Sequence, residues 1–218
     1  AKFSLLGLWL ISIIMLIVFG IKQASARAFS ESTVSTEHLY FPPATDTLEI
    51  NLESYDRKFR NKRKVEMRNG LTITRNASGE VVMVMDEVSI YIEKSRDSLT
   101  KIEIIKESDG SSFEVAEKYA EAINYDYKVD NNILYLQDFI TTARKNKMMN
   151  QGVRVNLYIP EGTVVKYTTD SDYRCHRFHI ENDRNLDACE MGNYIWKMGS
   201  DGEFKCQECP ELIAEYED

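Results

Sequence analysis

Hydrophobic and polar residues alternate over most of the chain. Leu48, Ile50 and Leu52 are apolar at every second position, with polar residues between them. Side chains on a strand point alternately to its two faces, so this period of two is typical of a strand with one buried face. We therefore expect a mainly β domain over residues 48–210. The alternation recurs at residues 65–67, 71–73, 81–85, 88–92, 102–104, 125–129, 133–136, 153–159, 164–167, 194–198 and 203–206.

Turn residues lie between several of these segments. Asn69 and Gly70 separate two of them, and this dipeptide is a strong signal for a tight hairpin turn. Ser200, Asp201 and Gly202 lie between the last two segments. We therefore expect two hairpins at these positions.

One segment has helical spacing instead. In residues 111–125 the apolar residues recur every three or four positions, and Ser111 with Glu114 fits a capping box at the start. An isolated helix of this length is marginal in water, so we expect it to pack one face against a sheet. The apolar positions are Val115, Ala116, Tyr119, Ala120 and Ile123.

The N-terminal residues 3–21 carry no charge. As a helix this run is roughly 28 Å long, close to the thickness of the hydrocarbon layer of a bilayer. We therefore expect a transmembrane helix over residues 1–23. Its membrane-anchoring side chains include Phe3, Leu8, Trp9, Ile13, Phe19 and Ile21.

A cleavable signal peptide is the alternative interpretation of this run. Ala24, Ser25 and Ala26 are small residues of the kind after which a signal peptidase cuts. Its apolar core usually covers only about 7 to 15 residues, which is shorter than the run found here. We therefore favour an anchor. Because the first residue is Ala1 and not Met, we also expect the natural chain to extend further upstream.

The segments that flank the predicted domain are polar. Residues 24–47 are rich in Ser, Thr and Ala and contain Pro42 and Pro43, so they predict a tether between the membrane and the domain. Residues 211–218 form an acidic tail.

The net charge of the chain limits the classes of molecule that it can bind. The net charge is -8 and the isoelectric point is about 5.1, which excludes a nucleic-acid surface because phosphate binding needs an excess of Lys and Arg. Residues 57–64 are the exception, with six cations in eight positions. This basic segment predicts either a solvated loop or strand edge, which we favour, or a site for anionic lipid headgroups.

Several segments together resemble a known family. They are similar to the C-terminal region of bacterial PspC-domain (phage-shock-protein-C-like) membrane proteins. The segments are residues 88–95, 116–125 and 157–163, Trp196 with the following Lys-Met-Gly, and Cys206-Gln-Glu-Cys-Pro. The resemblance covers the chain from the apolar run to Pro210. The PspC domain itself has no counterpart in these residues.

The resemblance implies a fold and a role. The fold is a stacked-strand domain, toast-rack or β-solenoid-like, that follows a membrane span. The role is a non-enzymatic one in an envelope-stress response at the bacterial cytoplasmic membrane. The implied partners are the lipid bilayer and other membrane or envelope-stress proteins, including copies of the chain itself, with no cofactor, small-molecule substrate or catalytic residue.

The cysteines and histidines near the C-terminus support a second hypothesis. Cys206 and Cys209 have the spacing of half a zinc knuckle, and Cys175 and His179 are further candidate ligands. A disulfide, between Cys206 and Cys209 or involving the other cysteines, is the competing interpretation. The alternative function is thus an anchored metal-binding or redox module. Its residues are Cys175, His176, His179, Cys189, Cys206 and Cys209.

Other sequence signals leave two questions open. Lys22 and Arg27 after the apolar run favour a cytoplasmic domain, whereas four cysteines favour an oxidising exterior.

A set of aromatic residues in or beside the predicted strands forms either a binding face or part of the core, and we favour the core. This set is Tyr119, Tyr125, Tyr127, Tyr135, Phe139, Tyr158 and Tyr167.

Overall fold

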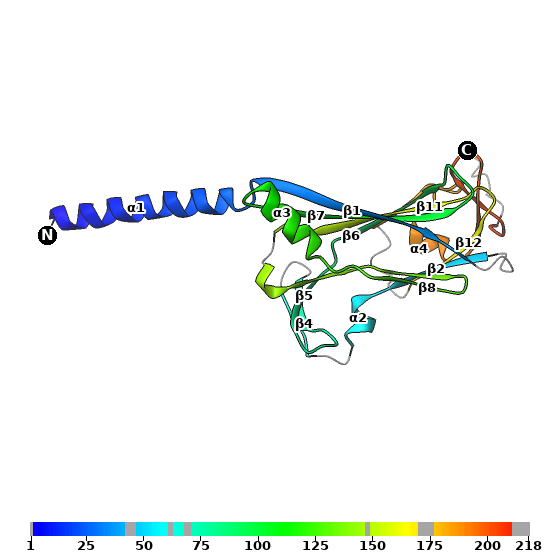
Figure 1. Cartoon of the computed structure of the whole chain (residues 1–218), viewed down its shortest axis with the longest axis horizontal. Coiled ribbons are helices and arrows are strands. Elements are labelled where there is room, and N and C mark those ends of the chain that lie inside the picture. The colour runs from blue at the N-terminus through cyan, green and yellow to red at the C-terminus, as the bar shows by residue number, and fades with distance from the viewer. Residues whose placement is uncertain are drawn as a thin grey trace, which may run out of the picture.

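The described residues of the domain form three β-sheets with short helices between the strands, and α1 extends away from them (Figure 1). This mainly β architecture confirms the fold class expected from the alternation of residues. The computed structural model of the chain describes residues 2–41, 47–60, 63–67, 71–146, 149–169 and 177–210.

The five-stranded sheet carries the longest strands. Its order is β1-β7-β11-β6-β13, with β6 parallel to both β11 and β13 and the other neighbours antiparallel. The strands are β1 (Phe29–Leu39), β7 (Thr100–Gly110), β11 (Gly152–Ile159), β6 (Val88–Lys94) and β13 (Phe178–Ile180).

Two further sheets complete the domain. The six-stranded sheet has the order β15-β14-β12-β2-β9-β8, formed by β15 (Phe204–Cys206), β14 (Ile195–Met198), β12 (Val164–Thr169), β2 (Thr47–Glu53), β9 (Ile133–Gln137) and β8 (Tyr127–Asp130). The four-stranded sheet has the order β10-β5-β4-β3, formed by β10 (Ile140–Ala143), β5 (Val81–Met85), β4 (Leu71–Arg75) and β3 (Val65–Glu66).

The apolar residues of the alternating pattern are the buried residues of the strands. Val88, Ile90 and Ile92 of β6 are buried, while Ser89 and Tyr91 between them remain partly exposed. In β2, Leu48, Ile50 and Leu52 are buried in the same way. These residues belong to one large core cluster that includes side chains of all three sheets. Burial of apolar surface therefore stabilises the stack of sheets.

Both predicted hairpins are supported. Strands β3 and β4 pair in antiparallel orientation, although residues 68–70 of the turn lie outside the described residues. Strands β14 and β15 pair with Trp196 opposite Cys206. Gly202 in the intervening turn has φ of +93°, a conformation that glycine adopts without a steric penalty.

Helix α3 (Phe113–Glu121) confirms the predicted amphipathic helix, but its first turn differs from the prediction. The capping residue is Ser112 and not Ser111, because the Ser112 hydroxyl accepts a hydrogen bond from the Val115 N–H. Ala116 and Ala120 are fully buried. A Cβ at Gly110 would lie 2.8 Å from Ala116 Cα, so this glycine allows α3 to approach the end of β7.

Helix α1 (Lys2–Ser25) contains the uncharged run, so its predicted helical conformation is confirmed. In the described part of the chain, however, no helix combines the length and apolar character needed to cross a membrane, and the predicted transmembrane span is not supported. Of the six predicted anchoring residues, Leu8, Trp9, Phe19 and Ile21 are exposed. Ile13 is partly exposed, and the Phe3 side chain lies outside the described residues.

The predicted tether is largely wrong. Residues Phe29–Leu39 form β1, which pairs with β7 along its whole length, so only residues 26–28 connect α1 to the domain. The sequence does not alternate there because β1 is an edge strand and most of its side chains face solvent. The pairing of β1 with β7 therefore depends on backbone hydrogen bonds and not on the burial of apolar side chains. Pro42, Pro43 and the acidic tail at 211–218 lie outside the described residues.

Three short helical segments were not predicted. They are α2 (Tyr55–Lys58), η1 (Arg144–Asn146) and α4 (Ala188–Met191). Each is too short to show a period of 3.6 residues in the sequence. Their ends are instead set by local caps, such as the capping box of Asp187 and Glu190 in α4.

Candidate interaction site at the end of the domain remote from α1

The strand register defines the two ends of the five-stranded sheet. Phe29, which follows α1 closely, pairs with Gly110, whereas Leu39 at the other end of β1 pairs with Thr100. Through β7 and β11 the same register places Val88 level with Thr33 in the middle of β1, and Lys94 at the remote end. The last residues of β6 are therefore remote from α1.

A groove of about 630 Å³ lies at this remote end. Strand β13 pairs with β6 only as far as Ile92, and β6 continues to Lys94. After β13 the chain turns towards the hairpin of β14 and β15, which we call the C-terminal hairpin. There the Phe204 N–H donates to the Glu181 carbonyl over 2.8 Å. The two segments thus diverge and open the groove. It is lined by Tyr91, Ile92, Glu93, Lys94, Phe178, His179, Ile180, Glu181 and Gly202.

An aromatic stack forms one wall of the groove. The rings of Tyr91 and His179 are nearly parallel, with centroids 4.3 Å apart and an angle of 15° between their planes. The pair forms because the two residues are direct neighbours on β6 and β13. The Arg154 guanidinium lies 5.4 Å from the centre of the Tyr91 ring, within the range of a cation–π interaction.

Polar contacts continue from this stack across the outer face of the sheet. Asn156 donates to Glu103 over 2.8 Å, and the Tyr158 hydroxyl donates to the same carboxylate over 3.5 Å. Lys101 lies 4.5 Å from the centre of the Tyr158 ring. Partial burial, followed by the negative charge of Glu103, raises the pKa of Tyr158, so its hydroxyl remains a neutral donor.

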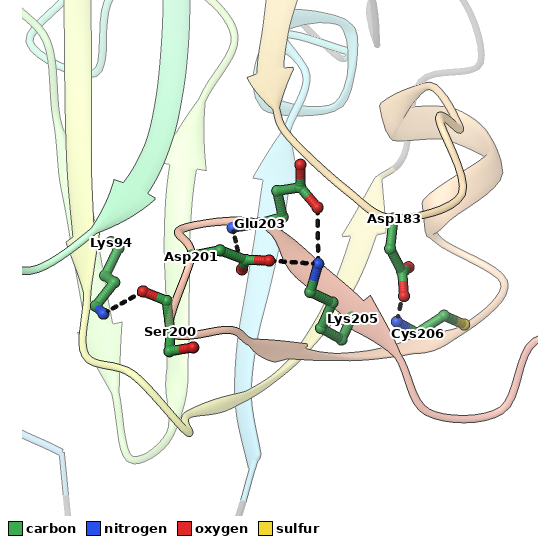
Figure 2. Close-up of polar contacts among 7 residues, drawn as sticks. All are labelled: Lys94, Asp183, Ser200, Asp201, Glu203, Lys205 and Cys206. Atoms are coloured by element: carbon green, nitrogen blue, oxygen red, sulfur yellow. Dashed lines mark hydrogen bonds and ion pairs between the residues drawn. The ribbon is translucent and has the colours of Figure 1, made fainter.

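The C-terminal hairpin contributes Gly202 to the lining of the groove. Lys94 at the end of β6 donates to the Ser200 carbonyl over 2.6 Å (Figure 2) and lies 2.7 Å from the Glu161 carboxylate. These contacts connect the hairpin turn to β6 and to the turn before β12. Such charge-assisted hydrogen bonds restrict the position of the hairpin relative to the groove.

A second lysine makes contacts within the hairpin. Lys205 Nζ lies 2.7 Å from both Asp201 Oδ2 and Glu203 Oε2, as Figure 2 shows. The hydrogen bonds to these two carboxylates raise the pKa of Lys205, and the bond from Lys205 lowers the pKa of Asp201. Both side chains are therefore charged near neutral pH and are unsuited to proton transfer.

A disulfide joins Cys206 and Cys209 directly after this hairpin, which confirms the disulfide interpretation. The Cys206 N–H donates to Asp183 Oδ1 over 3.1 Å and so holds the disulfide near the segment that follows β13 (Figure 2). Cys189 is also in a disulfide, and every described cysteine is oxidised.

These disulfides weaken the metal hypothesis. Cys206 and Cys209 cannot act as thiolate ligands while they are joined to each other. His179 lies in the groove with its ring stacked on Tyr91, and Cys175 and His176 lie outside the described residues. No group of three or more His, Cys, Asp or Glu side chains suited to a metal is present in the described ranges.

The aromatic residues divide between the core and the surface. Tyr125, Phe139 and Tyr167 are buried, as we expected. The others, Tyr119, Tyr127, Tyr135 and Tyr158, are partly exposed, so the core interpretation holds for only part of the set.

Tyr91 was not among the predicted site residues, although the sequence carries a signal for it. In residues 88–92 the alternation places Val88, Ile90 and Ile92 on the buried face of the strand, and Tyr91 lies on the opposite face. Tyr158 occupies the equivalent phase of β11. An aromatic residue in the outward phase of an alternating strand is therefore a useful marker of a surface site.

The basic segment at residues 57–64 lies elsewhere. It begins on α2, which is not at the α1 end of the domain (Figure 1). Lys64 lies 2.8 Å from both Asp56 and Glu66, and Lys58 lies 3.9 Å from Asp126. Neighbouring carboxylates thus neutralise part of its charge, which favours the solvated-loop interpretation over a headgroup site. Residues 61 and 62 lie outside the described residues.

Comparison with known proteins identifies a family match. The family model described as "ToastRack found in some PspC" matches residues 74–212, a segment that begins in β4 and includes every later strand. No curated protein and no solved structure matches the chain. The family match confirms the resemblance drawn from the sequence motifs.

Proposed function

This chain belongs to the toast-rack family found in some PspC proteins, and we propose that it is a membrane-associated, non-enzymatic module that binds other proteins in an envelope-stress response. The observation that carries the binding role is the groove at the remote end, with the Tyr91–His179 stack as one wall and Gly202 of the C-terminal hairpin on its other side.

The exposed side chains of α1 support membrane association. A helix that is apolar on all sides is stable only inside a large protein core or in lipid. Figure 1 shows α1 extending away from the domain, so the described strands and helices do not provide such a core. The exposed apolar side chains are Leu8, Trp9, Leu10, Ile11, Ile14, Met15, Leu16, Ile17, Val18, Phe19 and Ile21.

The chemistry of the hairpin and disulfide next to the groove supports binding over catalysis. Lys205 and Asp201 at the hairpin are held in their charged forms by each other, and the sulfur atoms of Cys206 and Cys209 are oxidised. Partly exposed aromatic side chains beside a fixed charged network are typical of protein-binding surfaces, where Tyr and Arg are enriched. We therefore assign a protein partner to the groove.

The disulfides also suggest the side of the membrane. Disulfides persist in oxidising compartments and are rare in the cytosol. The oxidised cysteines thus favour the exterior over the cytoplasmic side that Lys22 and Arg27 indicate. Alkylation of intact cells with a membrane-impermeant maleimide, after mild reduction of the surface, tests this placement. Labelling of Cys206 and Cys209 supports it, and protection of both until the cells are lysed contradicts it.

A site-specific crosslinking experiment tests the binding role. A photoreactive amino acid at Glu93, an exposed groove residue, should crosslink to other envelope proteins in stressed cells. The same amino acid at Val81, an exposed residue on the four-stranded sheet, serves as the matched control. The crosslinks at Glu93 should disappear in a Tyr91→Ala background. Equal crosslinking at both positions, or turnover of a small molecule by the purified chain, would contradict the proposal.

A further inference from the structure

The structure assigns a lipid-docking surface to the end of the domain next to α1. Its main residues are Phe29, the first residue of β1, and Phe113, the first residue of α3. We propose that these two rings lie in the interfacial layer of the membrane and hold this end of the domain against it. This inference rests on the proposed membrane association of α1.

The two rings form an exposed pair. Their centroids are 4.8 Å apart, and their planes meet at 67°, an edge-to-face arrangement. Phe29 is 37% exposed and Phe113 is 57% exposed. Helix α3 contacts the domain through Ala116 and Ala120, so Phe113 is not needed to fill the core. The pair therefore presents apolar surface to its surroundings.

The short connection to α1 fixes the depth of this pair. Only residues 26–28 separate α1 from β1, and three residues extend by at most about 10 Å. Phe29 thus lies close to the end of the helix whose apolar side chains we place in lipid. The apolar run ends at Ile21, so residues 22–28 cross the polar layer, which is several ångströms thick. The proposed docking requires these residues to run obliquely to the membrane normal, so that both rings reach this layer. Phe, together with Trp and Leu, is common on the apolar face of helices that lie in this layer.

The charge around the pair identifies the kind of lipid contact. Acidic and basic side chains are mixed around the pair: α3 exposes Glu114, Glu117, Lys118 and Glu121, Asp109 precedes Gly110 on β7, and Lys22 and Arg27 precede Phe29. This mixture carries no net positive charge that would attract an anionic surface, so the docking depends on apolar burial and needs no acidic lipid. We therefore commit to the interface of a zwitterionic bilayer as the occupant.

This docking sets the height of the candidate interaction site. The eleven residues of β1 extend over roughly 36 Å at about 3.3 Å per residue. The groove at the remote end would then face partners that project a similar distance from the membrane.

Tryptophan fluorescence tests this surface. The Phe113→Trp variant, in a Trp9→Phe background, is reconstituted in phosphatidylcholine vesicles whose acyl chains carry bromine near the headgroup, and the emission of the buried Trp196, measured in Trp9→Phe alone, is subtracted. Its emission should shift to shorter wavelength and lose intensity relative to vesicles without bromine. The Val34→Trp variant is the matched control, because Val34 is 59% exposed and lies five residues further along β1, about 16 Å away. Its emission should remain unquenched, and Phe29→Trp serves as a second probe.

The outcomes separate the two proposals. If the chain floats with vesicles but the probes at positions 113 and 29 behave like the probe at position 34, the docking surface is wrong and membrane association stands. If the chain does not float with vesicles, membrane association itself fails. If quenching at position 113 requires phosphatidylglycerol in the vesicles, electrostatic attraction replaces the apolar mechanism proposed here. Circular dichroism confirms that each variant remains folded.

Discussion

The ring of His179 lies nearly parallel to the ring of Tyr91, with 4.3 Å between their centroids. This contact joins β13, a strand of three residues, to the middle of β6. It also forms a wall of the groove to which we assign a protein partner. The stack therefore connects local strand pairing with the proposed binding role.

Replacement of Tyr91 with Ala should weaken partner capture more than it weakens the fold. An aromatic pair of this kind contributes about 0.5 to 1.5 kcal/mol beyond the area that it buries, and Tyr91 is only partly buried. We expect a loss of that order in the free energy of unfolding, measured by chemical denaturation. Tyr91→Phe, which keeps the ring, should retain both stability and crosslinking through Glu93. Unchanged crosslinking in Tyr91→Ala would remove the stack from the binding site.

Removal of residues 1–25 and removal of residues 1–44 should have different effects. The first deletion removes only α1 and should leave a folded β domain. The second also removes β1, whose eleven residues pair with β7. The backbone groups of β7 on that side would then lose their partners, so the transition in a thermal melt should move to lower temperature or become non-cooperative. Identical melts for the two deletions would show that β1 is dispensable.

The first turn of α3 provides a test with an adjacent control. Ser112→Ala should destabilise the protein by about 1 kcal/mol, because it removes the hydroxyl that accepts from the Val115 N–H. Ser111→Ala should change the stability by less than about 0.5 kcal/mol, because Ser111 is exposed and precedes the cap. Both values follow from urea denaturation. A larger effect at Ser111 would restore the capping box predicted from the sequence.

Alkaline pH should weaken the contact between β8 and β1. The Tyr127 hydroxyl donates to Glu37 over 2.6 Å, and partial burial together with this carboxylate raises the pKa of Tyr127 to about 12. The folded-state pKa lies above the usual value near 10, so the folded state holds this proton more tightly than the unfolded chain. The stabilisation is complete below pH 10 and is lost as the pH rises towards 12.

Chemical denaturation at pH 9, 10 and 11 measures this dependence. Wild-type protein should lose more stability over this range than Tyr127→Phe, which has no hydroxyl to ionise. Tyr125 also has a raised pKa because it is buried, but it contributes equally to both proteins. Parallel curves for the two proteins would show that the Tyr127–Glu37 contact does not contribute.

Several elements could be predicted because their signals are local. The period of two in β6 separates the buried Ile90 from the outward Tyr91, since side chains alternate along a strand. The helical spacing around Ala116 and Ala120 identifies α3 in the same way. The motifs shared with the PspC-associated family were sufficient to identify the toast-rack domain. Local patterns thus determined the type of element, its buried face and the family.

Only the tertiary structure decided which strands are neighbours and where the candidate site lies. Strand β2 lies between β12 and β9, and Asn51 donates to Thr168 over a separation of 117 residues. Strand β1 has no apolar alternation because its place at an edge leaves its side chains in solvent, so its pairing depends on the backbone of β7. The groove forms where β13 leaves β6 and the hairpin meets Lys94. Such relationships depend on contacts between distant segments, and the alternation within each segment is compatible with many of them.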